Sequence, residues 1–391
     1  MYMAHVLPTS ELGIYGLFTA SVNYTLYLVG LDYYTYTTRE LVSQPTNTWA
    51  PLLRDQLLFY VLTYTLSFPI LLLVFSSGLL PWNLAIWFFA MVAIEHFSQE
   101  IYRIMVIIQK PVLANILSFL RLGAWVYAVL VVFHYTSFTK SLEVIWWGWA
   151  LGGFSSIVIG LFVLRASINW DQLRSIPINW QAMYRGSKSS IRFLIATLSL
   201  RAVFTLDRYV LQEYTSITEV GIYSFYMSIA TSMQSFLDAG VIIFSYPKVV
   251  GAYQSGDYVN YIKFRNQMRI SVLGWVMALS IGVSLIIQPL VKLIEKEAFL
   301  DHLSVFYWLV ATIGLLGLSN LPHYELYAQR KDKAIILSAC WALLSFLGSI
   351  TFLAPRWGME GVAISLFVSM AVLYFSKFLY TLGLNSKRLS F

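Results

Sequence analysis

Long apolar stretches, separated by short polar segments, follow one another along almost the whole chain. A transmembrane helix needs about 20 mostly apolar residues, because the hydrocarbon core is roughly 30 Å thick and a helix rises about 1.5 Å per residue. The strands of a membrane barrel would instead give short alternating segments. The pattern therefore predicts eleven spanning helices, near residues 12–33, 56–77, 82–103, 112–135, 144–164, 191–213, 220–245, 269–290, 303–325, 334–353 and 360–383.

The composition agrees with that pattern. Of the 391 residues, 58% are hydrophobic and 12% are charged, whereas a soluble domain has about 45–50% apolar and about 25% charged residues. The mean hydropathy is +0.68. We therefore predict an all-α integral membrane protein. The single cysteine, Cys340, lies within a predicted span, so an intrachain disulfide and a cysteine metal cluster are both excluded.

Basic residues are unevenly divided between the loops of the two sides. Of the 26 lysines and arginines, eighteen fall on one side and four on the other. The positive-inside rule places the richer side in the cytoplasm. That side includes Arg39, Lys387 and Arg388, so we expect a cytoplasmic C-terminus and, with an odd number of spans, an outer N-terminus. The asymmetry also explains the net charge of +7 without a nucleic-acid partner, because no nucleic-acid-binding motif accompanies it.

The chain repeats itself weakly. Residues 9–15 read TSELGIY and residues 217–223 read ITEVGIY, so that a glutamate, a glycine, an isoleucine and a tyrosine recur at an offset of 208. Near the end of each half, WGWALGG at 147–153 parallels WGMEGVA at 357–363. Both copies of the first motif lie on the outer side by the basic-residue count. The repeats are therefore expected to be parallel, related by an axis along the membrane normal.

The repeat also predicts the domain organisation. A helix at 191–213 precedes the second copy of the motif, whereas no such helix precedes the first. We therefore expect two parallel-repeat helical lobes with twelve spans, of which the first is missing or truncated. The lobes are residues 1–164 and 191–391, joined at 165–190 by a cytoplasmic amphipathic linker whose tryptophans and arginines suit a membrane interface.

Three arginines lie deep within predicted spans, where a charge costs about 2.5–3.5 kcal/mol. Arg201 lies about ten residues, roughly 15 Å, into its helix, and Arg208 follows two turns later on nearly the same face. Arg121 is also near mid-depth. They either line a water-filled cavity that binds an anion, for which guanidinium is well suited, or each of them pairs with an acid on a neighbouring helix or extends to the headgroups. Lys377, nearer the cytoplasmic end, is expected to extend to the headgroups.

Other charged residues are candidates for supporting or coupling roles. Asp207 points about 100° away from the arginine stripe around its helix, so we expect it to meet another helix and to pair poorly with either arginine. Asp32 and Asp238 occupy similar places in the two repeats, where they either bind a coupling cation or end their helices. Arg39, on the cytoplasmic side, is a further supporting candidate.

Two more polar faces occur at helical spacing on the inner parts of their helices. The first comprises Glu95, His96, Gln99, Glu100 and Arg103, and the second comprises Asn320, His323 and Tyr327. Each either lines an inward-facing cavity or is the solvated end of a helix. The sequence has no phosphate-binding loop, no HExxH and no GxSxG motif. We therefore predict neither an enzyme nor a built-in ATPase, and no cofactor or metal site.

From Arg201 onward the chain resembles a known family. The resemblance rests on residues 206–257, with the pair Asp207 and Arg208, the EVGIYS turn, and a helix that ends in Pro247 and Lys248. LPTSELGIYGLF near the start and WGMEGVAISL near the end also fit. These loose motifs extend over essentially the full chain. They resemble the polysaccharide repeat-unit exporters, the O-antigen flippases of the Wzx type, in the multidrug/oligosaccharidyl-lipid/polysaccharide exporter superfamily.

The resemblance implies two six-helix lobes around a central cavity. It implies export of an undecaprenyl-diphosphate-linked oligosaccharide across the bacterial inner membrane. The oligosaccharide would be an O-antigen or capsule repeat unit, made for lipopolysaccharide or capsule biosynthesis. Cavity cations would receive the diphosphate, and Arg201 and Arg121 are the best placed, followed by Arg208. Membrane lipids, a polysaccharide polymerase and a chain-length regulator are the implied partners.

Two alternatives remain open at this point. A cation-coupled drug antiporter of the same superfamily should favour acids, and not arginines, in its cavity. A membrane enzyme of polysaccharide assembly, a polymerase or an acyltransferase, usually needs a large outer loop or an intramembrane histidine site.

Overall fold

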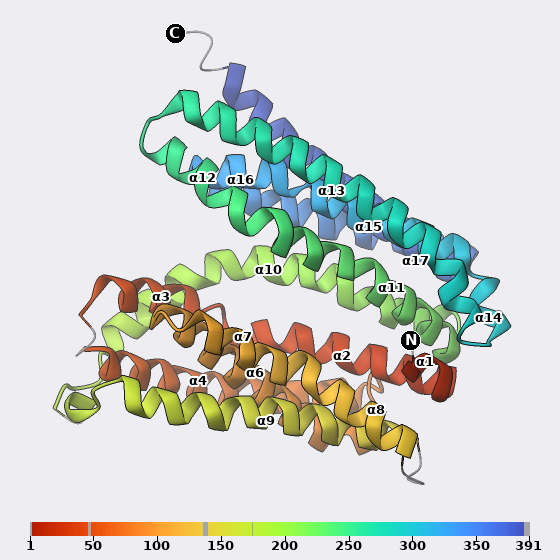
Figure 1. Cartoon of the computed structure of the whole chain (residues 1–391), viewed down its shortest axis with the longest axis horizontal. Helices are drawn as coiled ribbons and strands as arrows, with labels where there is room; N and C mark the ends of the chain where they lie inside the picture. Colours follow the sequence, from red (N-terminus) through yellow and green to blue (C-terminus); the bar gives the residue numbers. More distant parts are fainter. Residues whose placement is uncertain (1, 46–47, 136–139, 174, 387–391) are drawn as a thin grey trace. The chain divides into compact units, whose positions relative to one another are not determined.

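The computed structural model describes residues 2–45, 48–135, 140–173 and 175–386, and every regular element in these ranges is a helix (Figure 1). Helices suit the apolar stretches because each helix satisfies its own backbone hydrogen bonds in lipid. In chain order they are α1 (Tyr2–Val6), α2 (Thr9–Gly30), α3 (Tyr34–Ser43), α4 (Trp49–Leu71), α5 (Leu73–Ser76), η2 (Trp82–Leu84), α6 (Ala85–Ile107), α7 (Pro111–Phe119), η3 (Leu120–Ala124), α8 (Trp125–Tyr135), α9 (Leu142–Ser167), η4 (Asp171–Leu173), α10 (Trp180–Tyr214), α11 (Ile217–Leu237), η5 (Asp238–Ile242), α12 (Ile243–Gln254), α13 (Tyr258–Lys292), α14 (Glu297–Leu300), α15 (Leu303–Leu318), α16 (Asn320–Ala328) and α17 (Asp332–Ser386).

Ten helical stretches in the described ranges are long and apolar enough to cross a membrane. They match the eleven predicted spans, because the last two predicted spans both fall within α17. That element turns at Gly358, where φ is 50° and ψ is −126°, and glycine adopts a positive φ without steric cost. Ser369 Oγ on the far side of the turn donates to the carbonyl oxygen of Ala342 at 2.7 Å. The prediction of an all-α membrane fold is confirmed.

Close contacts divide the chain into two compact units. The N-terminal unit comprises residues 18–194, and the C-terminal unit comprises residues 1–17 together with 195–391. Helices α2 and α10 therefore contribute to both units. In the C-terminal unit, Lys296 Nζ donates to the carbonyl oxygens of Ala4 and Leu7 at 2.8 and 2.6 Å, which ties α1 to the segment before α14. The lobes expected from the repeat, with their linker at 165–190, remain a prediction.

The segment between α9 and α10 is held against α4. Arg54 Nη1 donates to the carbonyl oxygen of Leu173 at 2.7 Å, and Asp55 Oδ2 accepts from the backbone N–H of Asn179 at 3.0 Å. Helix α10 then begins at Trp180, before the start at 191 that the sequence predicts. The last part of the expected linker is therefore the first turns of a long helix. Lys387 and Arg388, on which the expected cytoplasmic C-terminus partly depends, lie outside the described residues.

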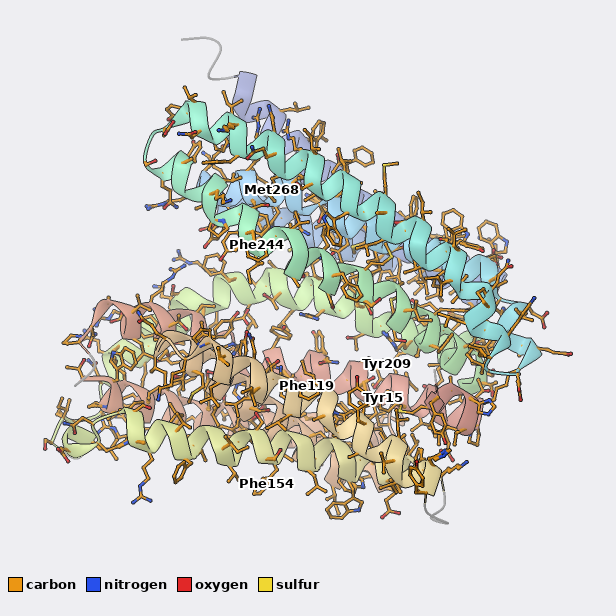
Figure 2. All side chains as sticks on the ribbon, viewed as in Figure 1. Tyr15, Phe119, Phe154, Tyr209, Phe244 and Met268 are labelled. Carbon is orange, nitrogen blue, oxygen red and sulfur yellow. The ribbon has the colours of Figure 1, made fainter. Side chains whose placement is uncertain are left out.

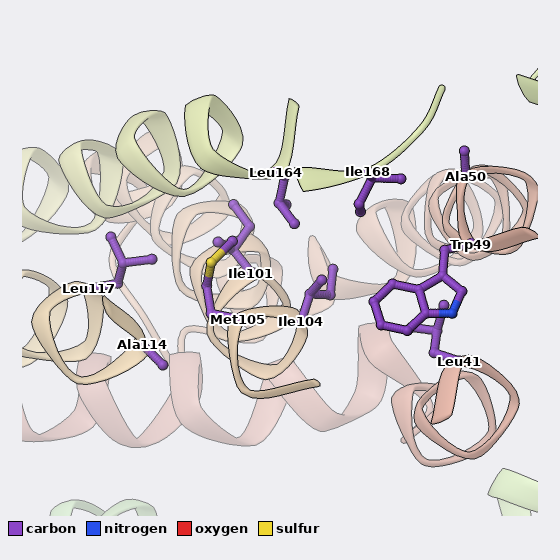
Figure 3. Packing of buried hydrophobic residues seen from close by; sticks show 10 residues of the cluster. All are labelled: Leu41, Trp49, Ala50, Ile101, Ile104, Met105, Ala114, Leu117, Leu164 and Ile168. Carbon is purple, nitrogen blue, oxygen red and sulfur yellow. The ribbon is translucent and has the colours of Figure 1, made fainter. Parts of the chain in front are cut away.

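An apolar cluster joins five helices of the N-terminal unit. Leu41 of α3, Trp49 of α4, Met105 of α6, Leu117 of α7 and Leu164 of α9 pack together in it, all of them buried (Figure 3). The cluster fixes α6 between its neighbours. This matters because α6 carries much of the buried charge of that unit.

A second cluster lies in the C-terminal unit. Met268 of α13 packs there with Leu237 of α11 and Val249 of α12. Other apolar side chains point away from their helices, as Phe154 of α9 and Phe244 of α12 do (Figure 2), and these two are 56% and 65% exposed. Soluble proteins rarely expose extended apolar surface, whereas a membrane protein needs such surface against lipid.

The repeated motif forms a close helix crossing within the C-terminal unit. A Cβ atom placed on Gly13 of α2 would overlap the carbonyl oxygen of Ile217 on α11, and one placed on Gly221 would overlap the carbonyl oxygen of Thr9. Thr9 and Ile217 are themselves equivalent in the repeat, so the two contacts are reciprocal. Small residues allow helix backbones to approach this closely. At this crossing the two copies of the motif pack against each other.

Candidate functional site

Helix α6 carries much of the buried charge of the N-terminal unit. Glu95, His96 and Glu100 are 4%, 3% and 5% exposed. The sequence allowed this face to be the solvated end of a helix, and that interpretation is wrong because neighbouring helices cover it. Buried charges are costly unless they are paired and hydrogen-bonded, so their partners decide what this face can do.

Glu95 is bound by side chains from two other segments. Arg121 Nη1 lies 3.1 Å from Glu95 Oε2, and Trp149 Nε1 donates to Glu95 Oε1 at 2.7 Å. Arg121 lies in the π-helical turn η3, a kind of distortion that is frequent at functional sites. Helix α9 approaches this turn closely at Gly152, where a Cβ atom would lie 2.7 Å from the carbonyl oxygen of Leu120. Arg121 is thus the buried counter-charge of Glu95.

Glu100 is the centre of a second network, shared between α4 and α6. Its Oε2 accepts from Gln56 Nε2 at 2.6 Å, and its Oε1 accepts from Arg103. His96 Nε2 lies 4.0 Å from the same Oε1, and His96 Nδ1 lies 3.0 Å from the hydroxyl of Tyr64. The two carboxylates of α6 are therefore matched by two guanidinium groups.

A small pocket adjoins this network. Its lining comprises Leu26, Tyr27, Gly30, Asp32, Tyr34, His96, Gln99 and Arg103. The guanidinium carbon of Arg103 lies 3.5 Å from the centre of the Tyr34 ring, a cation–π contact. Burial raises the pKa of the Tyr34 phenol, although Arg103 opposes the shift.

The pocket wall includes a strained turn. Leu31 and Asp32 have φ values of 49° and 50°, a left-handed conformation that is uncommon for residues with a side chain and is concentrated at functional sites. Asp32 thus lies both just beyond the end of α2 and in the pocket wall. Its coupling role stays a prediction.

In the C-terminal unit, α10 carries a buried ion pair. Arg208 Nη1 lies 3.1 Å from Asp207 Oδ1, and the hydroxyl of Tyr223 on α11 donates to Asp207 Oδ2 at 2.7 Å. The expectation that Asp207 meets another helix is confirmed by Tyr223. The expectation that Asp207 pairs poorly with an arginine of its own helix is wrong, because the Arg208 side chain folds back and also donates to the carbonyl oxygen of Phe204 at 2.7 Å.

Three other predicted residues are exposed. Arg201 lies within α10, Arg39 lies on α3, and Asp238 begins the π-helical turn η5. Asp238 Oδ1 accepts from Gln234 Nε2 at 2.8 Å. The binding role of Arg201 and the supporting roles of Arg39 and Asp238 stay predictions.

The second polar face, on α16, is also partly enclosed. The neighbouring Glu325 is buried and receives Arg269 Nη2 at 2.6 Å, with Arg265 Nη1 at 4.0 Å. Lys377 of α17 is 4% exposed. The expectation that it extends to the headgroups is wrong, because its side chain is buried within the helices of this unit.

The structure distributes the predicted site residues over both units. Arg121, Asp32 and Arg39 belong to the N-terminal unit, and Arg201, Arg208, Asp207 and Asp238 belong to the C-terminal unit. The sequence analysis missed Gln56, Tyr64 and Trp149 as partners of the α6 charges. Gln56, Tyr60 and Tyr64 recur every four residues, and that helical spacing was a usable signal. Nothing in the sequence marked Trp149 as a partner of Glu95, because tryptophan is common at the boundaries of membrane helices.

Comparison with known proteins gives matches at the level of structure. No family profile and no curated protein sequence matches the chain. A solved structure described as the inward-facing conformation of a multidrug resistance MATE family transporter of the MOP superfamily is 12% identical, with a TM-score of 0.80, over 97% of this chain and 91% of that one. A second, described as MATE in the bent conformation, is 13% identical with a TM-score of 0.59, over 97% of this chain and 93% of that one. This multi-pass membrane protein therefore has the MATE-like transporter fold.

Proposed function

We propose that this protein moves an undecaprenyl-diphosphate-linked oligosaccharide from the cytoplasmic to the outer leaflet of the bacterial inner membrane by alternating access. The fold it shares with solved MATE transporters supports transport over catalysis. The resemblance of residues 206–257 to O-antigen flippases supports a lipid-linked oligosaccharide as the substrate. A drug antiporter has the same fold, so the choice of substrate rests on the charges inside the spans.

The observation that carries this proposal is the exposure of Arg201. Helix α10 ends at Tyr214, so at about 1.5 Å per residue Arg201 lies roughly 20 Å from that end. A guanidinium exposed to lipid at such a depth costs about 2.5–3.5 kcal/mol. An exposed Arg201 is instead inexpensive if it faces a hydrated path, where it can bind diphosphate oxygens in a bidentate fork.

The other two arginines take supporting roles in this proposal. The side chains of Arg121 and Arg208 are only 11% and 13% exposed, so both are less accessible to a substrate than the exposed Arg201. Arg201 makes the first contact with the diphosphate. Movement of the lobes then exposes the headgroup on the outer side, while the lipid tail stays in the bilayer.

Complementation of a deletion strain tests the proposal. We expect Arg201→Ala to lose surface polysaccharide at least about tenfold, the effect of about 1.4 kcal/mol, and Arg201→Lys to recover part of it. Arg356→Ala is the matched control. Arg356 is also an exposed arginine, but it lies just beyond the predicted span 334–353 and not deep within a span. Normal surface polysaccharide in the deletion strain itself would refute the function, and a normal level with Arg201→Ala alone would refute the role of that arginine.

A second candidate, a cation-coupled drug antiporter, is favoured by the buried carboxylates Glu95 and Glu100. Acids within spans are typical of proton relays in transporters. This alternative predicts increased drug sensitivity of the deletion strain with unchanged surface polysaccharide. Growth with a panel of cationic drugs, measured beside polysaccharide staining of the same strain, separates the two candidates.

A further inference from the structure

Lys377 is a buried lysine in the C-terminal unit, and no carboxylate of the described residues forms an ion pair with it. Its side chain is 4% exposed on the second half of α17. None of the ion pairs formed by the described residues includes it. An ammonium taken out of water is expensive unless it is paired and hydrogen-bonded, so its place in the fold calls for an anionic partner.

Two carboxylates of the same unit, on or next to α16 and α12, are already engaged. Glu325 on α16 receives Arg269 at 2.6 Å and has Arg265 at 4.0 Å. Asp238, at the bend between α11 and α12, is exposed and accepts from Gln234. One of these acids therefore already has two cations, and the other faces an amide. Neither balances the charge of Lys377.

Two further polar groups near Lys377 also lack partners. Asn320 and His323 are one turn apart on α16 and so share a face. Helix α16, which carries both residues, packs against α17, which carries Lys377. Asn320 Nδ2 and His323 Nδ1 are buried and have no hydrogen-bond partner among the described residues. When the proton of His323 is on Nδ1, Lys377, Asn320 and His323 each offer a hydrogen-bond donor.

We propose that Lys377, His323 and Asn320 form a binding site for a phosphate group. This inference rests on the proposed function and assigns the diphosphate of its substrate a second contact besides Arg201. Phosphate oxygens accept strong charge-assisted hydrogen bonds, and lysine binds phosphate as a point charge. The donors come from two helices, α16 and α17, and a phosphate has enough oxygen atoms to accept from all three.

Thermal unfolding of the purified full chain in detergent tests the site. The probes are inorganic diphosphate and micellar undecaprenyl diphosphate, each added to the parent protein, to Lys377→Met and to Lys377→Arg. We expect the parent to gain at least about 2 °C in Tm with a bound anion. We expect Lys377→Met to melt above the ligand-free parent, because it removes an uncompensated charge, and to gain nothing from either probe. Lys377→Arg should retain most of the gain.

The outcomes separate the sources of the phosphate. A gain with both probes shows recognition of the phosphate itself, and a gain with the lipid alone shows that the site takes a headgroup from the membrane. No gain in the parent, or an equal gain in Lys377→Met, overturns the site. Melting of Lys377→Met below the ligand-free parent also overturns it, since Lys377 would then be a structural residue.

Two controls complete the experiment. Lys331→Met removes an exposed lysine at the start of α17 and should gain as much as the parent. If Lys377→Met does not fold, the double variant Asn320→Ala, His323→Ala replaces it and should lose at least half of the gain. The melting assay does not depend on transport. A site that binds diphosphate in a protein whose deletion leaves surface polysaccharide normal would refute the proposed function and leave the site standing.

Discussion

The α6 network of the N-terminal unit and the α16–α17 cluster of the C-terminal unit solve the problem of buried charge in different ways. On α6, Glu95 is matched by Arg121 and Glu100 by Arg103. At the α16–α17 cluster, Glu325 has two arginines of its own, while Lys377 has no acid within ion-pair distance among the described residues. The α6 network is balanced in charge, whereas the α16–α17 cluster has a lysine that belongs to none of these ion pairs.

This difference separates buried charges that stabilise the fold from buried charges that are available to a ligand. A charge-balanced and hydrogen-bonded network can hold helices together, because breaking it leaves a buried charge alone. A group of buried donors without acceptors does not hold helices together in this way, because each unsatisfied donor costs about 1–3 kcal/mol. We therefore assign the α6 network mainly to the integrity of its unit and the α16–α17 cluster to binding.

Removing Arg121 should have the largest effect on the α6 network. Arg121→Met leaves Glu95 buried without a cation, so we expect a loss of about 3–5 kcal/mol in the free energy of unfolding. Thermal unfolding in detergent measures it. The double variant Arg121→Met, Glu95→Gln removes both charges and should recover most of the loss. If the single variant unfolds like the parent, the pair does not hold the helices together.

Removing the indole donor should cost less. Trp149→Phe keeps an aromatic side chain, though a smaller one, and loses the 2.7 Å hydrogen bond from the indole N–H to Glu95; a hydrogen bond to a charged group contributes about 1.5–3 kcal/mol. We expect a loss within that range in the same melting assay. Trp147→Phe, which changes an exposed tryptophan on the same helix, serves as the control and should change little. Equal melting of the two variants would contradict the role of the indole.

Separating α9 from the π-helical turn should weaken the network indirectly. In Gly152→Ala the new methyl group lies 2.7 Å from the carbonyl oxygen of Leu120 and 3.0 Å from Trp125. Overpacking of this kind costs about 1–3 kcal/mol. Gly348→Ala is the control, because no atom lies within 4 Å of a Cβ at that position. The close approach is unimportant if both alanine variants melt alike.

The smallest effect is expected on the other side of the comparison. Arg269 is bonded to Glu325, but its side chain is 41% exposed and Arg265 stands nearby. Solvent screening limits such a pair to about 0.2–1 kcal/mol, so we expect Arg269→Met to lose less than about 1 kcal/mol. A loss as large as that of Arg121→Met would erase the distinction between the two regions.

The sequence predicted the spans well, because apolar length is enough to identify a membrane helix. It did not predict how they end. Helix α10 begins at Trp180, where polar residues continue a helix that the hydropathy pattern starts at 191. By contrast, the turn at Gly358 in α17 does fall in the gap that the pattern left between the last two predicted spans. Helix ends depend on local capping and tertiary contacts, and hydropathy contains neither.

The charges were found as residues but not as pairs. Periodicity placed Glu95 and Glu100 on one face of a helix, and depth alone singled out Arg121. Neither signal shows which helices are neighbours, so the pairing of Arg121 with Glu95 was not predicted. The burial of Lys377 was missed for the same reason. Its distance from the end of its span suggested a headgroup contact, but in the structure its side chain is buried.

The reciprocal crossing of Gly13 and Gly221 has a consequence for the history of the chain. Each copy of the motif supplies the surface on which the other copy packs. A substitution that adds a side chain in one copy is therefore felt by its own duplicate, and drift at one position is constrained by the state of the other. Neither glycine can therefore be replaced by a larger residue unless the backbone of the other copy moves away.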